Sequence, residues 1–112
     1  MLKLSNFQID GFMNDVLARL QNWYSSQCNG EWEHSHGVTI ETIDNPGWTV
    51  EIDLKDTRWE NVSFEDLDFE RAPGDWVRCS KKDAHFKGNG DPSKLDLILN
   101  HFLTQVENSV KT

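Results

Sequence analysis

Two histidines separated by one residue, His34 and His36, are suited by type and spacing to bind a metal ion. On an extended segment both imidazoles project to the same side, which is how one strand can supply two zinc ligands. A zinc site needs a third ligand, and the other candidates show no ligand spacing: His85, His101, Cys28 and Cys79. We therefore expect a solvated or hydrogen-bonded pair near the start of a strand. A small metal-dependent hydrolase that uses His34, His36 and a carboxylate is the alternative.

Other residue types that could do covalent or acid–base chemistry occur without a supporting pattern. Cys28 lies next to a run of carboxylates, which raise the pKa of a thiol and make it a poorer nucleophile. Glu31 and Glu33 are of the type used as general acid and base in glycoside hydrolysis, but nothing in the sequence sets their separation. The segment Gly88-Asn89-Gly90 lacks the pattern of a phosphate loop and predicts a turn. We predict no enzymatic activity, no bound metal and no cofactor.

Residues 31–70 form an acidic tract with twelve acidic side chains and two basic ones, a net charge of −10 within a chain of net charge −8. Disordered acidic tails are poor in aromatic residues. This tract instead interleaves its carboxylates with large apolar residues: Trp32, Ile40, Trp48, Val50, Ile52, Leu54, Trp59, Phe64 and Phe69. The pattern predicts a folded, negatively charged surface that attracts a basic partner.

Length and composition indicate one domain, residues 1–112, with five Trp and six Phe available for its core. No apolar run reaches the length of roughly 20 residues that spans a bilayer. The first eleven residues lack the basic flank of a secretion signal, and residues 1–12 could form a loose leader. We expect a cytoplasmic protein, monomeric or weakly dimeric, that binds neither a membrane nor nucleic acid directly, because a phosphate-binding surface needs clustered Lys and Arg.

Helical spacing of apolar residues predicts one helix near each end of the chain. The first covers residues 13–27, with Asp10 or Asn14 as its cap and Asn29-Gly30 as its stop. The second covers residues 95–110, with Asp91 or Ser93 as its cap and Pro92 near the first turn.

Strand patterns fill the middle of the chain. Residues 38–44 and 48–54 predict a hairpin, and Pro46-Gly47 is typical of a type II turn. Residues 62–70, residues 76–79 and a segment ending at Phe86 predict further strands. The expected fold is α+β, an antiparallel sheet of three to five strands with the N-terminal and C-terminal helices packed on one face. The other face would be in water and would carry Glu51 and Asp53.

Short motifs in a fixed order carry a resemblance to a known family. They are Trp32-Glu33, Pro46-Gly47-Trp48, Asp75-Trp76-Val77 and Gly88-Asn89-Gly90-Asp91-Pro92. With the residues between them, over most of residues 15–105, the chain resembles the immunity protein 53 family of bacterial polymorphic toxin systems. The resemblance implies a small cytoplasmic protein that binds and neutralises a cognate toxin and has no enzymatic activity.

The sequence thus favours an immunity protein that neutralises a basic toxin, for example a nuclease, by stoichiometric contact through an acidic surface. A general adaptor for some other basic protein is a further alternative. We expect Trp32, Pro46, Gly47 and Trp48 to shape the surface rather than to touch the partner. The predicted contact residues are carboxylates of the acidic tract: Glu33, Glu41, Glu51, Asp53, Asp56, Glu65, Asp66 and Asp68.

Overall fold

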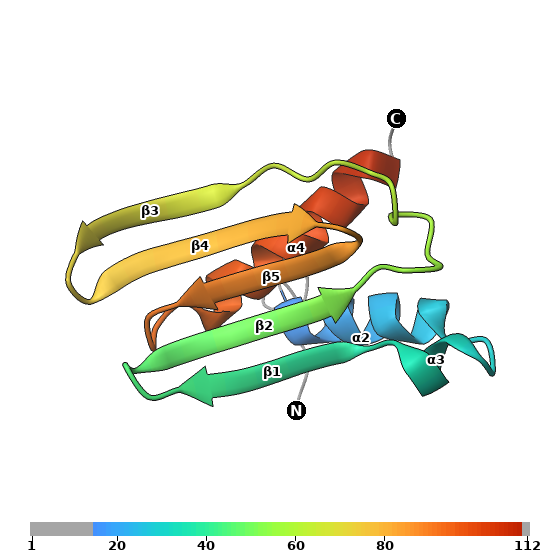
Figure 1. Cartoon of the computed structure of the whole chain (residues 1–112), viewed down its shortest axis with the longest axis horizontal. Helices are drawn as coiled ribbons and strands as arrows, with labels where there is room; N and C mark the ends of the chain where they lie inside the picture. The colour runs from blue at the N-terminus through green and yellow to red at the C-terminus, as the bar shows by residue number, and fades with distance from the viewer. Residues whose placement is uncertain (1–14, 111–112) are drawn as a thin grey trace, which may run out of the picture.

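The computed structural model describes residues 15–110, which form one antiparallel sheet covered on one face by helices (Figure 1). This confirms the predicted α+β class. The predicted leader, residues 1–12, lies outside the described residues. The elements in chain order are α2 (Val16–Gln27), α3 (Trp32–Ser35), β1 (Val38–Ile43), β2 (Gly47–Asp53), β3 (Leu67–Ala72), β4 (Asp75–Lys82), β5 (His85–Gly90) and α4 (Leu95–Val110).

The sheet has the strand order β1-β2-β5-β4-β3, and every neighbouring pair is antiparallel. Three hairpins join β1 to β2, β3 to β4 and β4 to β5. The remaining connection, residues 54–66, leads from β2 to β3 at the far edge, so β5 lies between β2 and β4. The long acidic tract therefore supplies both edges of the sheet, while β4 and β5 occupy its middle.

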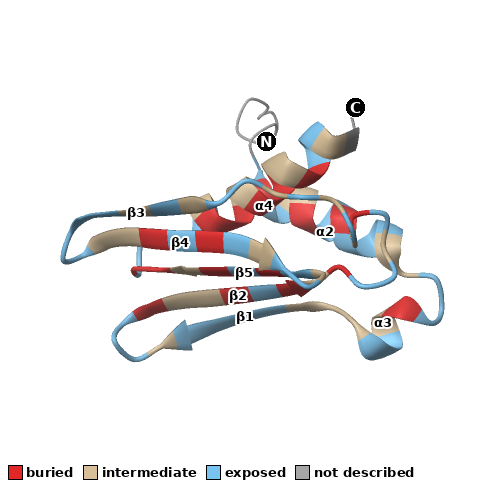
Figure 2. Ribbon diagram, turned by 45° about the horizontal axis from the view of Figure 1, so that its top comes forward, coloured by how far each residue is buried: buried red, intermediate tan, exposed pale blue. Residues whose placement is uncertain are grey.

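The core lies between the sheet and the helices, as the buried residues on the inner strands and on the helix sides facing them show (Figure 2). The predicted alternation of β2 is confirmed, because Val50 and Ile52 are fully buried and Glu51 between them is exposed. Helix α4 packs on this face with Phe102, whose ring lies 5.2 Å from that of Phe86 on β5.

Four aromatic residues join the two helices and the loops into one cluster. The Trp23 ring on α2 lies 5.0 Å from Phe102, 6.1 Å from Trp32 and 6.0 Å from Trp59. Trp32 and Trp59 are buried, with 4% and 7% of their surfaces exposed, so they belong to the core rather than to an exposed aromatic anchor. Their indole N–H groups donate to the Lys55 carbonyl and the Ser109 hydroxyl respectively.

Helix α2 begins later than predicted. Asp15 caps it, because its carboxylate accepts a hydrogen bond of 3.1 Å from the Ala18 N–H. The predicted caps, Asp10 and Asn14, lie outside the described residues. The helix ends at Gln27, and Gly30 follows with a φ of +93°, in agreement with the predicted stop.

The β1–β2 hairpin is confirmed, but the predicted type II turn is wrong. The Asn45–Pro46 peptide bond is cis, and Gly47 is the first residue of β2 rather than a turn residue with positive φ. Gly47 is required by packing instead, because a Cβ atom there would lie 2.2 Å from the Gly90 carbonyl oxygen.

Two further expectations about the strands were wrong. The strand predicted over residues 62–70 begins only at Leu67, and Phe64 packs on the core from a loop. The turn predicted at Gly88-Asn89-Gly90 is part of β5. Glycine is needed at Gly88 because α4 crosses close to the strand, and a Cβ atom there would lie 2.4 Å from Ile98 Cγ2.

Candidate partner-binding surface

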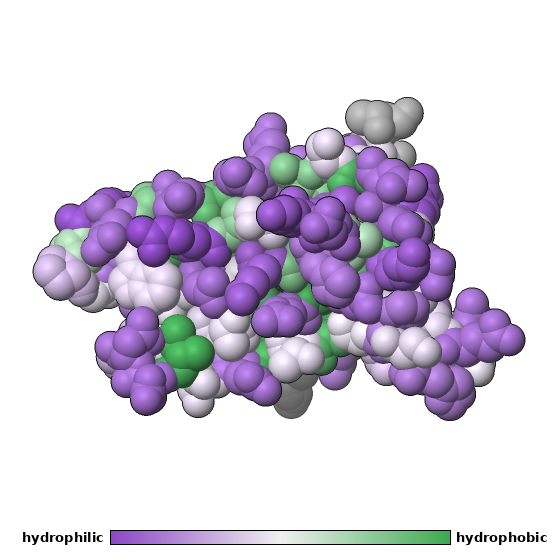
Figure 3. Space-filling model, in the orientation of Figure 1, coloured by the Kyte–Doolittle hydropathy of each residue, from purple (hydrophilic) through white to green (hydrophobic). Residues whose placement is uncertain are grey.

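The sheet face turned away from the helices, here called the open face, is mainly hydrophilic (Figure 3). The register aligns Glu41, Thr49, Asn89, Arg78 and Asp68 in one row across it. The next row aligns Thr39, Glu51, Lys87 and Ser80. The predicted exposure of this face is confirmed for Glu51, whereas only 19% of the Asp53 side chain is exposed.

The charges of the open face are segregated by strand, so the face is not uniformly negative. Carboxylates lie on β1, β2 and β3, and a stripe of basic residue types follows the neighbouring strands β4 and β5: Arg78, Lys82, His85 and Lys87. Ion pairs join the two, with Arg78 3.3 Å from Asp68 and Lys87 3.8 Å from Glu51. Because these groups are more than half exposed, each pair contributes at most about 1 kcal/mol to folding.

Carboxylates and imidazoles line a hollow of about 340 Å³. It lies where α3 meets the start of β1 and the end of β2. Helix α3 is anchored by Asn29, whose side-chain oxygen accepts hydrogen bonds from the N–H groups of Glu31 and Trp32. Glu33 completes the anchor by accepting from the N–H groups of Asn29 and Gly30. The residues lining the hollow include Glu33, His34, His36, Glu51, Asp53 and His85.

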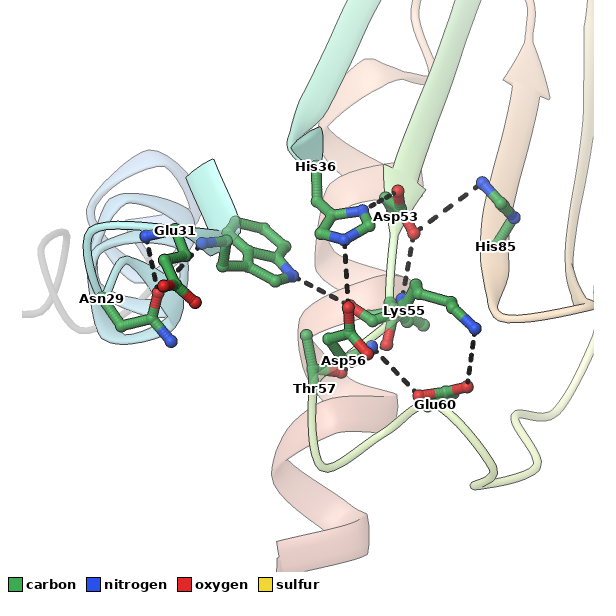
Figure 4. A network of polar contacts seen from close by, with 11 residues as sticks. Asn29, Glu31, His36, Asp53, Lys55, Asp56, Thr57, Glu60 and His85 are labelled. Atoms are coloured by element: carbon green, nitrogen blue, oxygen red, sulfur yellow. Dashed lines mark hydrogen bonds and ion pairs between the residues drawn. The ribbon is translucent and has the colours of Figure 1, made fainter. Parts of the chain in front are cut away.

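His36 lies at the centre of a polar network beside this hollow (Figure 4). Its Nδ1 is 2.5 Å from Asp53 Oδ2, and its Nε2 is 3.4 Å from Asp56 Oδ2. The hydrogen bond with Asp53 raises the pKa of His36. Burial raises the pKa of Asp53, but hydrogen bonds from the Lys55 N–H and from His36 outweigh it and lower that pKa. The pair thus favours a protonated imidazole next to an ionised carboxylate.

Because folding raises the pKa of His36 above 6.5, protonated His36 contributes stability that is complete below pH 6.5. This contribution is lost as the pH rises through the raised pKa. We expect the urea midpoint of the wild type to fall more than that of His36→Gln between pH 6 and 9, and an NMR titration of His36 to have its midpoint above 6.5. A midpoint at or below 6.5 contradicts the prediction.

His34 and His36 do not lie on an extended segment, which was the condition for one strand to supply two metal ligands. His34 lies in helix α3 and His36 directly follows it, so the two side chains are not presented by one strand. Within residues 15–110 no group of three or more His, Cys, Asp or Glu side chains has an arrangement that could hold a metal ion. The thiols show no activating surroundings: Cys28 lies against the Tyr24 carbonyl oxygen, and burial raises the pKa of Cys79 to about 12.

The structure brings only part of the predicted contact set together. Glu41, Glu51, Asp53 and Asp68 lie on strands with side chains toward the open face. Asp66 lines a second hollow with Asp68, Arg78 and Lys87. Three carboxylates lie off this face. Glu33 caps α3, Asp56 is held beside His36, and the backbone of Glu65 is bonded to His101 and Gln105 of α4.

Sequence reasoning missed a buried ionic cluster at the start of α4. Lys94 Nζ lies 2.7 Å from both Asp75 and Asp91, and Asp91 is 2% exposed. Asp91 also accepts from the N–H groups of Trp76 and Ser93. The Trp48 indole N–H donates to the Pro92 carbonyl at the same place. Trp48, Asp75, Trp76, Asp91 and Pro92 belong to the sequence motifs, but Ser93 and Lys94 do not, and no local pattern indicated that these residues meet.

Fold and surface together define a small two-layer α+β domain with a charged sheet face that no described element covers. None of its described helices is long and apolar enough to span a membrane. A sequence model of the family described as immunity protein 53 matches residues 17–107. The chain belongs to this family, which implies an immunity protein that acts against a toxin. No curated protein and no solved structure gives a match.

Proposed function

We propose that this protein neutralises a basic toxin domain by stoichiometric binding through the carboxylates of its open face. The observation that supports this is the placement of Glu41, Glu51 and Asp68 on one exposed face of a chain with net charge −8. A toxin that attacks nucleic acid fits this chemistry, because contact with phosphates requires clustered Lys and Arg. The acidic face would mask such a cluster.

The ion pairs of the open face do not oppose this role. Arg78 and Lys87 are exposed and pair with exposed carboxylates, so exchanging these partners for toxin cations costs little. Opposite fields accelerate encounter, to about 10⁸–10⁹ M⁻¹s⁻¹ at low salt in well-steered pairs. Fast capture suits an antidote, which must act before the toxin does damage.

Glu41 and Glu51 are the carboxylates best suited to test the proposal. Asp53 is unsuitable, because its reversal would break the bonds to His36 and to the Lys55 N–H. We expect Glu41→Lys combined with Glu51→Lys to slow association with the toxin about tenfold or more at low salt. The difference should shrink toward 1 M salt, where charges are screened beyond about 3 Å. Stopped-flow mixing with an inactive form of the cognate toxin domain, to be sought first in the gene next to this one, measures this.

The matched control is Glu31→Lys combined with Asp96→Lys, which changes the net charge equally at exposed positions off the open face. Equal association rates for both double variants would remove the open face from the interface. Failure of the wild type to co-purify with the toxin domain would overturn the proposed function itself. A general adaptor for another basic protein predicts that failure.

A further inference from the structure

Strand β1 is an edge of the sheet, and within residues 15–110 no strand pairs with its outer side. The Gly37 carbonyl accepts a hydrogen bond of 3.1 Å from the Asp53 N–H, which makes Gly37 and Asp53 a hydrogen-bonded pair. Such pairs alternate along an antiparallel ladder. The N–H and C=O groups of Val38, Ile40 and Thr42 therefore point outward, away from β2.

The two edges of the sheet differ in how they oppose pairing with another chain. Strand β3 carries charges at Asp68, Glu70 and Arg71, and its register shifts between Glu70 and Ala72. Both features block strand addition. Strand β1, with the sequence Val-Thr-Ile-Glu-Thr-Ile, has regular pairing over its whole length and a single charged residue, Glu41. It is the edge open to a further strand.

On the helix side, β1 borders an apolar groove. Tyr24 and Ile40 are each 37% exposed there, and Leu17, one helical turn before Gln21 on α2, is 61% exposed. Between α2 and β1 lies a hollow of about 340 Å³ lined by Leu20, Gln21, Tyr24, Gly37 and Val38. A strand added to β1 would place every second side chain over this groove, because strand side chains alternate between faces.

On the open face, the same added strand would meet negative charge. Glu41 is exposed on β1, and Glu51 lies on β2 directly opposite Thr39. The remaining side chains of an added strand would therefore be matched by lysine or arginine.

We propose that the toxin extends this sheet with a strand of its own, paired to the outer side of β1, in which apolar and basic side chains alternate. The inference rests on the proposed function and names the edge that the partner uses. Charge decides against a second copy of this chain as the occupant, because each copy has a net charge of −8 and would bring its own Glu41 to the shared edge.

Amide hydrogen exchange of the full-length protein, free and bound to the same inactive toxin domain, tests the inference without a mutation. We expect exchange at Ile40 and Thr42 to slow at least tenfold in the complex. Complex formation with unchanged rates at these amides overturns the inference and leaves the proposed function intact. Protection already present in the free protein also overturns it, and indicates residues 1–14 or, if it rises with concentration, a second copy. No complex at all overturns the proposed function.

Ile40→Pro removes an outward N–H without removing a hydrogen bond to β2. Ile40→Ala is its matched control, because it removes the same side chain and keeps the N–H. We expect the proline variant to bind the toxin domain about 10- to 100-fold more weakly than the alanine variant. Equal affinities of the two folded variants contradict pairing at β1. If the proline variant does not fold, the exchange experiment on the wild type decides.

Discussion

Replacing Asp91 by alanine is expected to lower the melting temperature by about 10 °C or more, since removing one member of a buried charge pair is strongly destabilising. Asp91 is 2% exposed, and its carboxylate accepts four hydrogen bonds. The donors are the Trp76 N–H, the Ser93 N–H and hydroxyl, and Lys94 Nζ. Without it Lys94 keeps Asp75 as its carboxylate partner, and the start of α4 loses its tie to β4. Thermal unfolding followed by circular dichroism measures the loss.

Two controls separate the charge of Asp91 from its shape and from net charge. Asp91→Asn keeps an acceptor of the same shape and should lose less, while Asp96→Ala removes an exposed carboxylate from the same helix and should change little. Hydrogen bonds from Lys94 and Ser93 hold the pKa of Asp91 well below 3.8, so its contribution is complete above pH 3.8 and is lost as the pH falls. The Asn variant should therefore lose less stability than the wild type in acid. A melting temperature of Asp91→Ala within 3 °C of the wild type contradicts the role given to this carboxylate.

Gly47→Ala is expected to cost about 2–3 kcal/mol, the upper part of the range of about 1–3 kcal/mol that is usual for forcing atoms into a filled site. The new Cβ atom would lie 2.2 Å from the Gly90 carbonyl oxygen, and backbone of a central strand cannot move away as a side-chain end can. Urea unfolding measures the change. Gly74→Ala is the control, because nothing lies within 4 Å of a Cβ atom there and it should be neutral or slightly stabilising. Equal midpoints for the two variants would contradict the close approach of β2 and β5.

These two predictions concern one place in the fold. Trp48 donates to the Pro92 carbonyl, Gly47 lies against Gly90, and Trp76 donates its N–H to Asp91. Three of the four motifs that carry the family resemblance thus meet where the chain passes from β5 to α4, whereas Trp32-Glu33 lies in α3. Their contacts hold β2, β4, β5 and the start of α4 together, so variants there should reduce the stability of the fold more than the affinity for a toxin. Variants at Glu41 or Ile40 should do the opposite.

Local patterns were sufficient to predict much of the fold. Alternation in residues 48–54 predicted which side of β2 is buried, and helical spacing predicted α4. Both signals are local, because burial of one face imposes a period of two or 3.6 on neighbouring residues. The turn at Pro46-Gly47 and the strand at Gly88-Asn89-Gly90 were mispredicted for the opposite reason. A Cβ atom at Gly47 would collide with the Gly90 carbonyl oxygen, and one at Gly88 would collide with Ile98. Only the tertiary fold brings these groups near one another.

The sequence by itself determined a net charge of −8, an α+β domain and a carboxylate-rich tract that must be folded, since charge and periodicity are properties of the chain alone. Tertiary structure decided how that charge is presented. Placing β4 and β5 in the middle of the sheet put Arg78 and Lys87 between two acidic edges. It also left β1 as an edge beside an apolar groove. Strand order follows from which surfaces pack together over long separations, and no short stretch of sequence records it.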